Sequence, residues 1–109
     1  MSEEVTIRRA QPSDCVAIMV LLRTYFGEQS INYPPIEESD CLRWVINTIA
    51  YGGSFVAIYN NKLVGSVGVS VCEFEWNRAG KYLRNEWYTV HPKYRRLGIA
   101  QKLLKECKR

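Results

Sequence analysis

The sequence predicts an α+β or mixed α/β fold with the element order β-α-α-β-β-β-α. Apolar residues recur at helical spacing in three separate segments, and β-rich runs separated by turn residues occupy the middle of the chain. The 109 residues show no internal repeat or linker, so we expect one domain spanning residues 1–109. Because 47% of the residues are apolar, we expect a globular chain and not a disordered one.

A strand followed by a helix is predicted near the start. The segment VTIRRA, residues 5–10, alternates and is rich in strand-forming residues. Pro12, Ser13 and Asp14 are typical of a helix start. The apolar side chains that follow recur at intervals of three and four and define one helix face: Cys15, Ile18, Met19, Leu22 and Phe26. We expect Gly27 to end this helix.

A loop and a second helix come next. Pro34 and Pro35 exclude regular pairing in EQSINYPPI, residues 28–36. The second helix is predicted from about residue 37 to residue 50, before Gly52-Gly53. Its predicted apolar stripe consists of Cys41, Leu42, Val45, Ile46 and Ile49.

Three consecutive strands are predicted in the second half. Residues 54–76 predict a hairpin, because two β-rich runs flank Asn60-Asn61, which tolerate the positive φ of a tight turn. NRAG, residues 77–80, is predicted as a second turn. KYLRNEWYTV, residues 81–90, is predicted as the third strand, and His91-Pro92 is expected to end it.

Positive charge is concentrated in the last third of the chain. Residues 81–109 hold nine Lys/Arg and two acids, whereas residues 1–80 hold six and nine, which together give the net charge of +4. A phosphorylated small molecule or nucleic acid would explain this distribution, and a solvated basic helix face is the alternative. We do not expect nucleic acid, because the basic residues gather at one helix start and form no stripe with stacking aromatics.

The stretch VHPKYRRLGIAQKLL, residues 90–104, predicts an anion site at a helix start. A last helix is expected from Gly98, with Ala100, Leu103, Leu104 and Cys107 on its apolar side. Its first N–H groups lack internal partners, and the helix dipole favours a negative group there. Gly98 has no Cβ to keep a bulky anion from the backbone, and Arg95 and Arg96 can add forked hydrogen bonds. Several N–H donors and two cations together favour a pyrophosphate over a carboxylate.

These residues resemble a known family. RRLGIA, residues 95–100, matches the Arg/Gln-x-x-Gly-x-Gly/Ala signature of the GNAT acetyltransferase superfamily, and VHPKY, residues 90–94, is similar to the usual sequence before it. The predicted element order is also the family's N-terminal order, so the resemblance covers nearly all of the chain. It implies a largely antiparallel sheet flanked by helices, with acetyl-CoA as co-substrate and no metal.

In that family the signature loop binds the pyrophosphate of acetyl-CoA. The resemblance implies that the pyrophosphate is held here mainly by the backbone N–H groups of Arg95, Arg96, Leu97, Gly98, Ile99, Ala100 and Gln101. It also implies that Tyr88, Thr89 and Val90 pair with the pantetheine arm like an added strand. An N–H group there would polarise the acetyl carbonyl.

Acetyl transfer to an amine needs a free lone pair, so the ammonium form must first lose a proton. Glu86 resembles the glutamate assigned as general base in polyamine-acetylating members, and strand alternation would place it on the same face as Tyr88 and Val90. In many members a water chain takes the proton. The alternative role for Glu86 is that of a surface glutamate paired with Arg84 or a lysine.

Acceptor contacts are expected in the loop between the first two helices, which walls the acceptor pocket in this family. Tyr33 and Glu37 are the candidates, with Glu38 and Asp40 nearby. The alternative is that these acids only complement the dipole at the helix start. His91 is interpreted as a strand-end residue and not as a base. The acceptor itself stays an unidentified amine, because the fold does not select one.

The family normally continues after the signature helix with another strand, a helix and closing strands. The resemblance therefore implies that this sequence lacks the C-terminal strand-helix-strand, and with it the tyrosine that commonly protonates the CoA thiolate. Three explanations stay open: a piece of a longer or truncated chain, a homodimer or partner that completes the open sheet edge, or a degenerate form. The leading hypothesis is an N-acetyltransferase that works by direct transfer in a ternary complex; the alternative is a non-catalytic CoA-binding or partner-binding module.

The remaining features concern location and metals. Four widely separated cysteines, no CxxC and a single histidine predict free thiols and no zinc site. The start MSEEVTIRRA lacks the apolar segment of a secretory signal, and no apolar run approaches the length of a membrane span. We therefore expect a cytoplasmic protein without a membrane partner.

Overall fold

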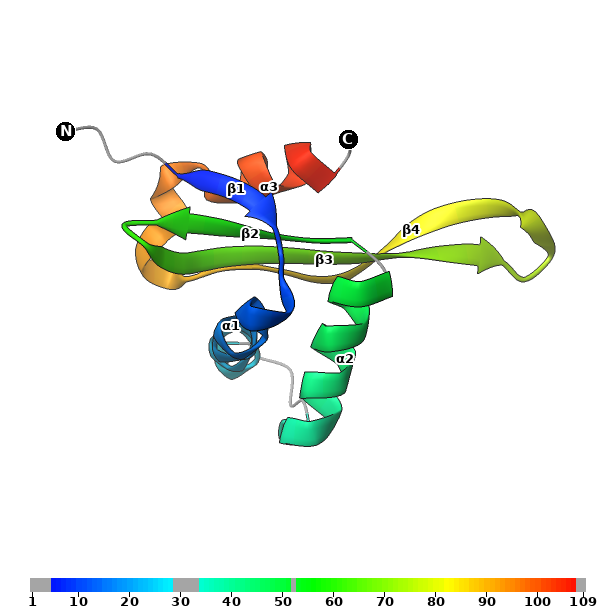
Figure 1. Ribbon diagram of the computed structural model, residues 1–109, viewed down its shortest axis with the longest axis horizontal. Helices are drawn as coiled ribbons and strands as arrows, with labels where there is room; N and C mark the ends of the chain where they lie inside the picture. Colours follow the sequence, from blue (N-terminus) through cyan, green and yellow to red (C-terminus); the bar gives the residue numbers. More distant parts are fainter. Residues whose placement is uncertain (1–4, 29–33, 52, 108–109) are drawn as a thin grey trace.

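The computed structural model describes residues 5–28, 34–51 and 53–107, and Figure 1 shows their arrangement. The strands are β1 (Thr6–Arg9), β2 (Gly53–Tyr59), β3 (Lys62–Phe74) and β4 (Asn77–Val90). The helices are α1 (Cys15–Glu28), α2 (Glu38–Tyr51) and α3 (Ile99–Cys107), with short 3₁₀ helices η1 (Pro12–Asp14) and η2 (Pro92–Leu97). This order confirms the predicted α+β class and the pattern β-α-α-β-β-β-α.

One antiparallel sheet forms the middle layer of the molecule. Its strands lie in the order β1-β2-β3-β4. α1 and α2 lie on one face of the sheet, and α3 lies on the other (Figure 1). Because both faces are covered here, β3 has a continuous buried stretch from residue 64 to residue 69 instead of strict alternation.

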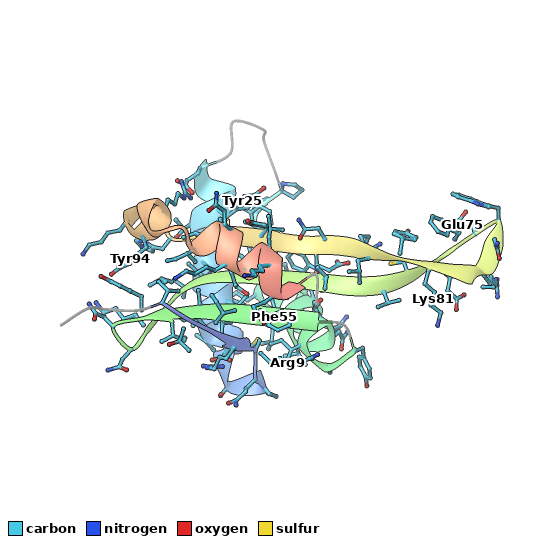
Figure 2. All side chains as sticks on the ribbon, turned by 90° about the horizontal axis from the view of Figure 1, so that it is seen from above. Arg9, Tyr25, Phe55, Glu75, Lys81 and Tyr94 are labelled. Atoms are coloured by element: carbon cyan, nitrogen blue, oxygen red, sulfur yellow. The ribbon has the colours of Figure 1, made fainter. Side chains whose placement is uncertain are left out.

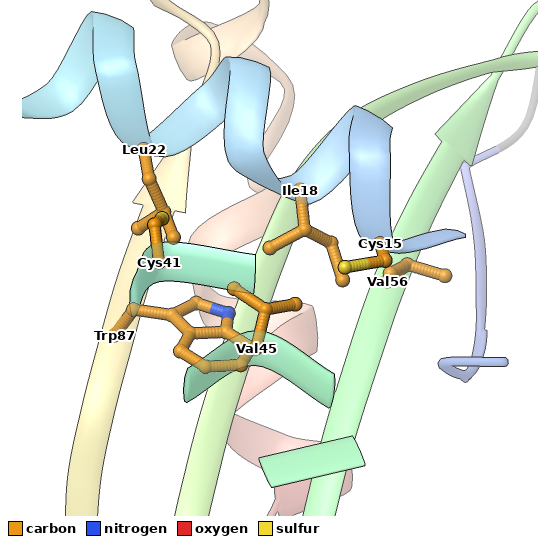
Figure 3. Packing of buried hydrophobic residues seen from close by; sticks show 7 residues of the cluster. All are labelled: Cys15, Ile18, Leu22, Cys41, Val45, Val56 and Trp87. Carbon is orange, nitrogen blue, oxygen red and sulfur yellow. The ribbon is translucent and has the colours of Figure 1, made fainter. Parts of the chain in front are cut away.

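Each face of the sheet carries its own apolar cluster. The first, between the sheet and α1 and α2, consists of Cys15, Ile18, Leu22, Cys41, Val45, Val56 and Trp87 (Figure 3). The second, beneath α3, consists of Ala57, Val64, Val67, Val69, Val90, Ile99 and Leu103. Gly65 allows the close approach of α3, because a Cβ there would lie 3.2 Å from Ile99 and 3.3 Å from Leu103. This packing fixes the start of α3 beside the end of β4.

The helices depart from the prediction at two points. Gly27 does not end α1, which continues to Glu28; a glycine inside a helix costs only about 1 kcal/mol. The buried face of α2 contains Thr48, and the predicted stripe residues Leu42 and Ile46 are exposed. Thr48 tolerates burial because its hydroxyl donates to the Trp44 carbonyl at 2.8 Å.

One of the two predicted turns is confirmed and the other is wrong. Asn60 and Asn61 adopt positive φ angles of 54° and 61° between β2 and β3. The second turn lies at residues 75–76 and not at residues 77–80, because Phe74 already pairs with Asn77. Aromatic packing stabilises this end: the Phe74 ring lies 5.0 Å from that of Trp76 and 4.8 Å from that of Tyr82. β4 is therefore longer than predicted.

A β-bulge interrupts β4 at Glu86. Trp87 pairs with Gly68 and Asn85 pairs with Val69, so two steps along β4 correspond to one along β3. The bulge turns the Glu86 side chain toward α2, whereas the Tyr88 hydroxyl contacts α3. The prediction that Glu86 shares a strand face with Tyr88 was therefore wrong, because simple alternation does not hold across the bulge.

Candidate functional site

The junction of β4 and α3 leaves backbone N–H donors without a helical partner at a helix start. η2 follows β4 and is capped by His91, whose Nδ1 accepts from the Lys93 N–H at 3.2 Å. Gly98 then adopts a left-handed conformation with φ 71°. The first helical bond runs from the Lys102 N–H to the Gly98 carbonyl at 3.3 Å, so the N–H groups of residues 99–101 precede the ladder. This geometry agrees with an anion site.

The outer edge of β4 presents backbone groups beside these donors. The His91 N–H donates to the Val64 carbonyl at 2.7 Å, toward β3. Since alternate residues of an antiparallel strand bond to the same neighbour, the backbone of Thr89 also faces β3. The backbone groups of Tyr88 and Val90 consequently face away from β3, along the edge of the described sheet.

A hollow of about 480 Å³ lies where this edge meets α3 and the end of α1. It is lined by Tyr25, Glu28, Tyr88, Thr89, Val90, Arg95 and Ala100. The structure thus brings together five of the residues predicted to contact acetyl-CoA. The Tyr88 hydroxyl donates to the Ala100 carbonyl at 2.5 Å and ties β4 to the first turn of α3.

Arg95 makes contacts that the sequence did not predict. Its Nε donates to the Val90 carbonyl at 3.0 Å, and its Nη1 and Nη2 donate to the Glu28 carboxylate at 3.1 and 2.6 Å. The hydrogen bond from Arg95 holds the pKa of Glu28 below its usual value. Glu28 lies 67 residues away in sequence and carries no motif, so only the fold could reveal it. The side chains of Arg96 and Leu97 lie outside the described part of the structure.

Glu86 is the centre of a largely buried polar network. Its side chain is 9% exposed and accepts hydrogen bonds from Trp44 Nε1 at 3.0 Å, Ser70 Oγ at 2.6 Å and Arg84 Nε at 2.7 Å. The Arg84 bond, followed by those of Ser70 and Trp44, lowers the pKa of Glu86 to about 2. The carboxylate borders a hollow of about 400 Å³ between α2 and the base of the β3–β4 hairpin. The pairing with Arg84, which belongs to the alternative role considered for Glu86, is thus present, but the side chain is largely buried and not that of a surface glutamate.

Replacing Glu86 with glutamine is expected to make the free energy of unfolding depend less on pH in the acid range. The folded pKa lies below the unfolded value, so the ionised form contributes stability above pH 4.5 and loses it as the pH falls toward 2. We expect this contribution to be about 1 to 2 kcal/mol, because exposed Arg84 is partly screened by water. Urea unfolding of both chains at several pH values between 2 and 7 measures it. If the free energy of unfolding fell equally steeply with falling pH in the two chains, the result would contradict a stabilising role for the network.

The remaining predicted site residues are the acceptor candidates Glu37 and Tyr33. Glu37 caps α2, accepting from the Ser39 and Asp40 N–H groups at 3.3 and 3.0 Å, and lines a third hollow of about 330 Å³ beside Trp44. The Glu37 carboxylate thus lies at the start of α2, where the alternative considered above has it complement the helix dipole. Tyr33 lies outside the described residues. Figure 2 places Glu75 and Lys81 far from Tyr25, at the outer end of the β3–β4 hairpin.

Three further observations concern thiols, metals and membranes. Cys15, Cys41 and Cys72 are free thiols, and burial raises the pKa of Cys15 and Cys41. Within residues 5–28, 34–51 and 53–107, no three His, Cys, Asp or Glu side chains gather as metal ligands would. None of the described helices combines the length and apolar character that a membrane span requires.

Comparison with solved structures identifies similar folds. A predicted acetyltransferase from Clostridium acetobutylicum, solved with acetyl-CoA, superposes with a TM-score of 0.80 at 17% identity, over 95% of this chain and 71% of that one. The aminoglycoside N-acetyltransferase AAC(6')-Iy in complex with CoA gives 0.76 at 14% identity, over 99% and 69%. A GNAT family acetyltransferase from Staphylococcus aureus gives 0.68 at 19% identity, over 95% and 75%.

Sequence comparison defines the family. No curated protein matches the chain at a significant level. The family model described as "Acetyltransferase (GNAT) family" matches residues 16–109, which is most of the chain and includes the hollow beside β4 and α3. The protein therefore belongs to the GNAT acetyltransferase family.

Proposed function

We propose that this protein is an acetyl-CoA-dependent N-acetyltransferase that transfers acetyl directly to a primary amine in a ternary complex. The observation that carries the proposal is that the free edge of β4 and the start of α3 border the same hollow. An extended arm can pair with the edge of β4, and a pyrophosphate can bind at the start of α3.

The backbone donors beside the hollow suit the pyrophosphate and the pantetheine arm of acetyl-CoA. Open space surrounds Gly98, where an added Cβ would meet nothing within 4 Å, so a bulky phosphate can reach the helix start. The N–H groups of Ile99, Ala100 and Gln101 would hold the pyrophosphate, with those of residues 95–98 alongside. Tyr88 and Val90 would pair with the pantetheine arm, and an N–H of this edge would stabilise the carbonyl oxygen as it gains charge.

Glu86 is proposed to act through its fixed negative charge. A carboxylate with a pKa of about 2 is a weak base at neutral pH, so direct proton abstraction would be inefficient. Its charge can instead orient a water that accepts the amine proton, and it favours the positive charge that develops on nitrogen during attack. The thiolate of CoA leaves as the carbon–nitrogen bond forms, and it takes a proton from water or from a group outside the described residues.

The acceptor is proposed to approach from the side of α1 and α2. Two hollows lie along this side of α2, and Trp44 lines both of them. Glu37 and Tyr33 remain our candidates for contacts with a cationic amine. Free thiols favour a cytoplasmic location for this reaction.

The activity is tested by incubating the protein with acetyl-CoA and a panel of amines, with product detection by mass spectrometry. The panel should hold polyamines, aminoglycosides, lysine and a peptide with a free N-terminus. We expect amine-dependent release of CoA, reduced about 10- to 100-fold in the Glu86→Gln variant. If no amine is acetylated by a folded sample, the enzymatic proposal fails.

A non-catalytic CoA-binding or partner-binding module is the second candidate. Its supporting observation is the β3–β4 hairpin, which extends beyond the helices (Figure 1) and exposes Val71 by 60%, Leu83 by 55% and Trp76 by 82%. Together with the free edge of β4, this surface would suit a second copy or another partner. A chain that stays monomeric over a wide concentration range would count against this candidate.

A further inference from the structure

Arg95 occupies the point at which the free edge of β4 ends. The Nε–H group of its guanidinium donates to the Val90 carbonyl oxygen at 3.0 Å. The remaining two donor groups go to the two oxygens of Glu28. A forked arginine–carboxylate pair of this kind is directional, so it fixes the plane of the guanidinium. We call this arrangement of Glu28, Arg95 and Val90 the edge clasp.

The edge clasp removes one hydrogen-bond acceptor from the edge. The Val90 carbonyl faces away from β3, because the neighbouring His91 N–H is the group that bonds to β3. Without Arg95, an extended ligand could pair with this carbonyl and continue past it. With Arg95 in place, the backbone groups left for such pairing are those of Tyr88 and the N–H of Val90. The pairing edge of β4 therefore ends at Val90, and the short helix η2 lies between this point and the start of α3.

The bond to Glu28 also limits the ability of the Arg95 side chain to bind a phosphate. Nη1 and Nη2 of Arg95 both donate to the carboxylate of Glu28, the last residue of α1, so the forked pair of donors that a phosphate would bind is already in use. The carboxylate balances the arginine charge at this point. Arg95 in this state is a poor phosphate ligand, although its sequence position alone predicted that role.

We propose that Arg95, held by Glu28, is a positioning residue that ends the pairing edge of β4 at Val90 and thereby sets the register of the pantetheine arm relative to α3. This inference rests on the proposed function. It assigns to Glu28, a residue outside the signature, a part in cofactor placement. It also places the action of the Arg95 side chain at the arm and not at the phosphates.

The test compares CoA with pantetheine, which keeps the arm and lacks the pyrophosphate and nucleotide. Binding is followed through the backbone amide NMR signals of Tyr88 and Val90, which remain measurable for weak ligands. The variant Arg95→Lys keeps the charge but loses the fork, and we expect it to weaken both ligands by a similar factor, about tenfold. Glu28→Gln should also weaken the binding of both CoA and pantetheine. Lys93→Met removes a charge from the same segment without touching the edge clasp, and should leave pantetheine binding unchanged.

Each other result overturns the inference. If Arg95 were a phosphate ligand, Arg95→Lys would weaken CoA alone or leave both affinities unchanged. If Glu28 only repelled the phosphates, Glu28→Gln would tighten CoA. If pantetheine left the Tyr88 and Val90 signals of the wild-type protein unmoved while CoA bound, the edge would not carry the arm, and the register role would fail without loss of CoA binding. If the wild-type protein bound neither ligand, the proposed function would fail as well.

Discussion

Replacing Gly98 with glutamate is expected to weaken acetyl-CoA binding on the order of 100-fold or more. Gly98 has φ 71°, a left-handed conformation that costs a residue with a Cβ about 1 to 2 kcal/mol. The new carboxylate would also stand beside the N–H groups that open α3, where a pyrophosphate is proposed to bind. Isothermal titration calorimetry of both chains with acetyl-CoA measures the loss.

The control separates charge from backbone strain. Gly98→Lys introduces a long side chain at the same φ, and its positive charge favours the anion instead of opposing it. We expect this variant to retain much more affinity than Gly98→Glu, with both folded by circular dichroism. Equal affinity in the glutamate variant and the wild-type protein would show that the pyrophosphate does not bind at this helix start.

Replacing Gly68 with alanine is expected to destabilise the fold by about 2 to 4 kcal/mol. The Trp87 indole lies directly over Gly68, so an added Cβ would come within 2.5 Å of Cε2 and 2.6 Å of Cζ2. The ring would have to move, and its Nε1 would lose the buried bond of 2.9 Å to Ser66 Oγ. Trp87 also packs edge-to-face on Trp44, so the displacement would reach the Glu86 network. Urea denaturation measures the change in the free energy of unfolding.

Gly27→Ala is the matched control for this substitution. Gly27 lies within α1, and an added Cβ there meets nothing within 4 Å. Alanine in a helix is favoured over glycine by about 0.5 to 1 kcal/mol, so this variant should be slightly more stable. If Gly68→Ala left the free energy of unfolding unchanged, the indole could shift at little cost, and the close packing at the bulge would not be needed for stability.

The element order could be predicted because local signals agreed along the chain. The helical spacing after Pro12, the Asn60-Asn61 turn and the glycine before α3 each act through neighbouring residues. The turn at residues 75–76 was missed because Asn77 and Gly80, which follow it, are residues typical of turns. Aromatic packing of Phe74, Trp76 and Tyr82 stabilises the actual bend.

The details of the site depend on contacts between distant residues. The Arg84–Glu86 pair was one of the alternatives, but the bulge at Glu86 arises from pairing with β3 and reverses the expected side-chain direction. The bond between Arg95 and Glu28 joins two segments that share no local pattern. A signature motif therefore located the hollow, while the partners of its charged side chains required the tertiary structure.

The central claim, that β4 and α3 form an acetyl-CoA site, is tested most directly by thermal unfolding of the wild-type chain with and without acetyl-CoA. At about 100 times its dissociation constant, the ligand should add roughly 2.7 kcal/mol to the free energy of unfolding. We predict a clear, saturable rise in the unfolding temperature, which CoA also produces. A well-folded sample whose unfolding temperature does not move at millimolar acetyl-CoA would contradict the account.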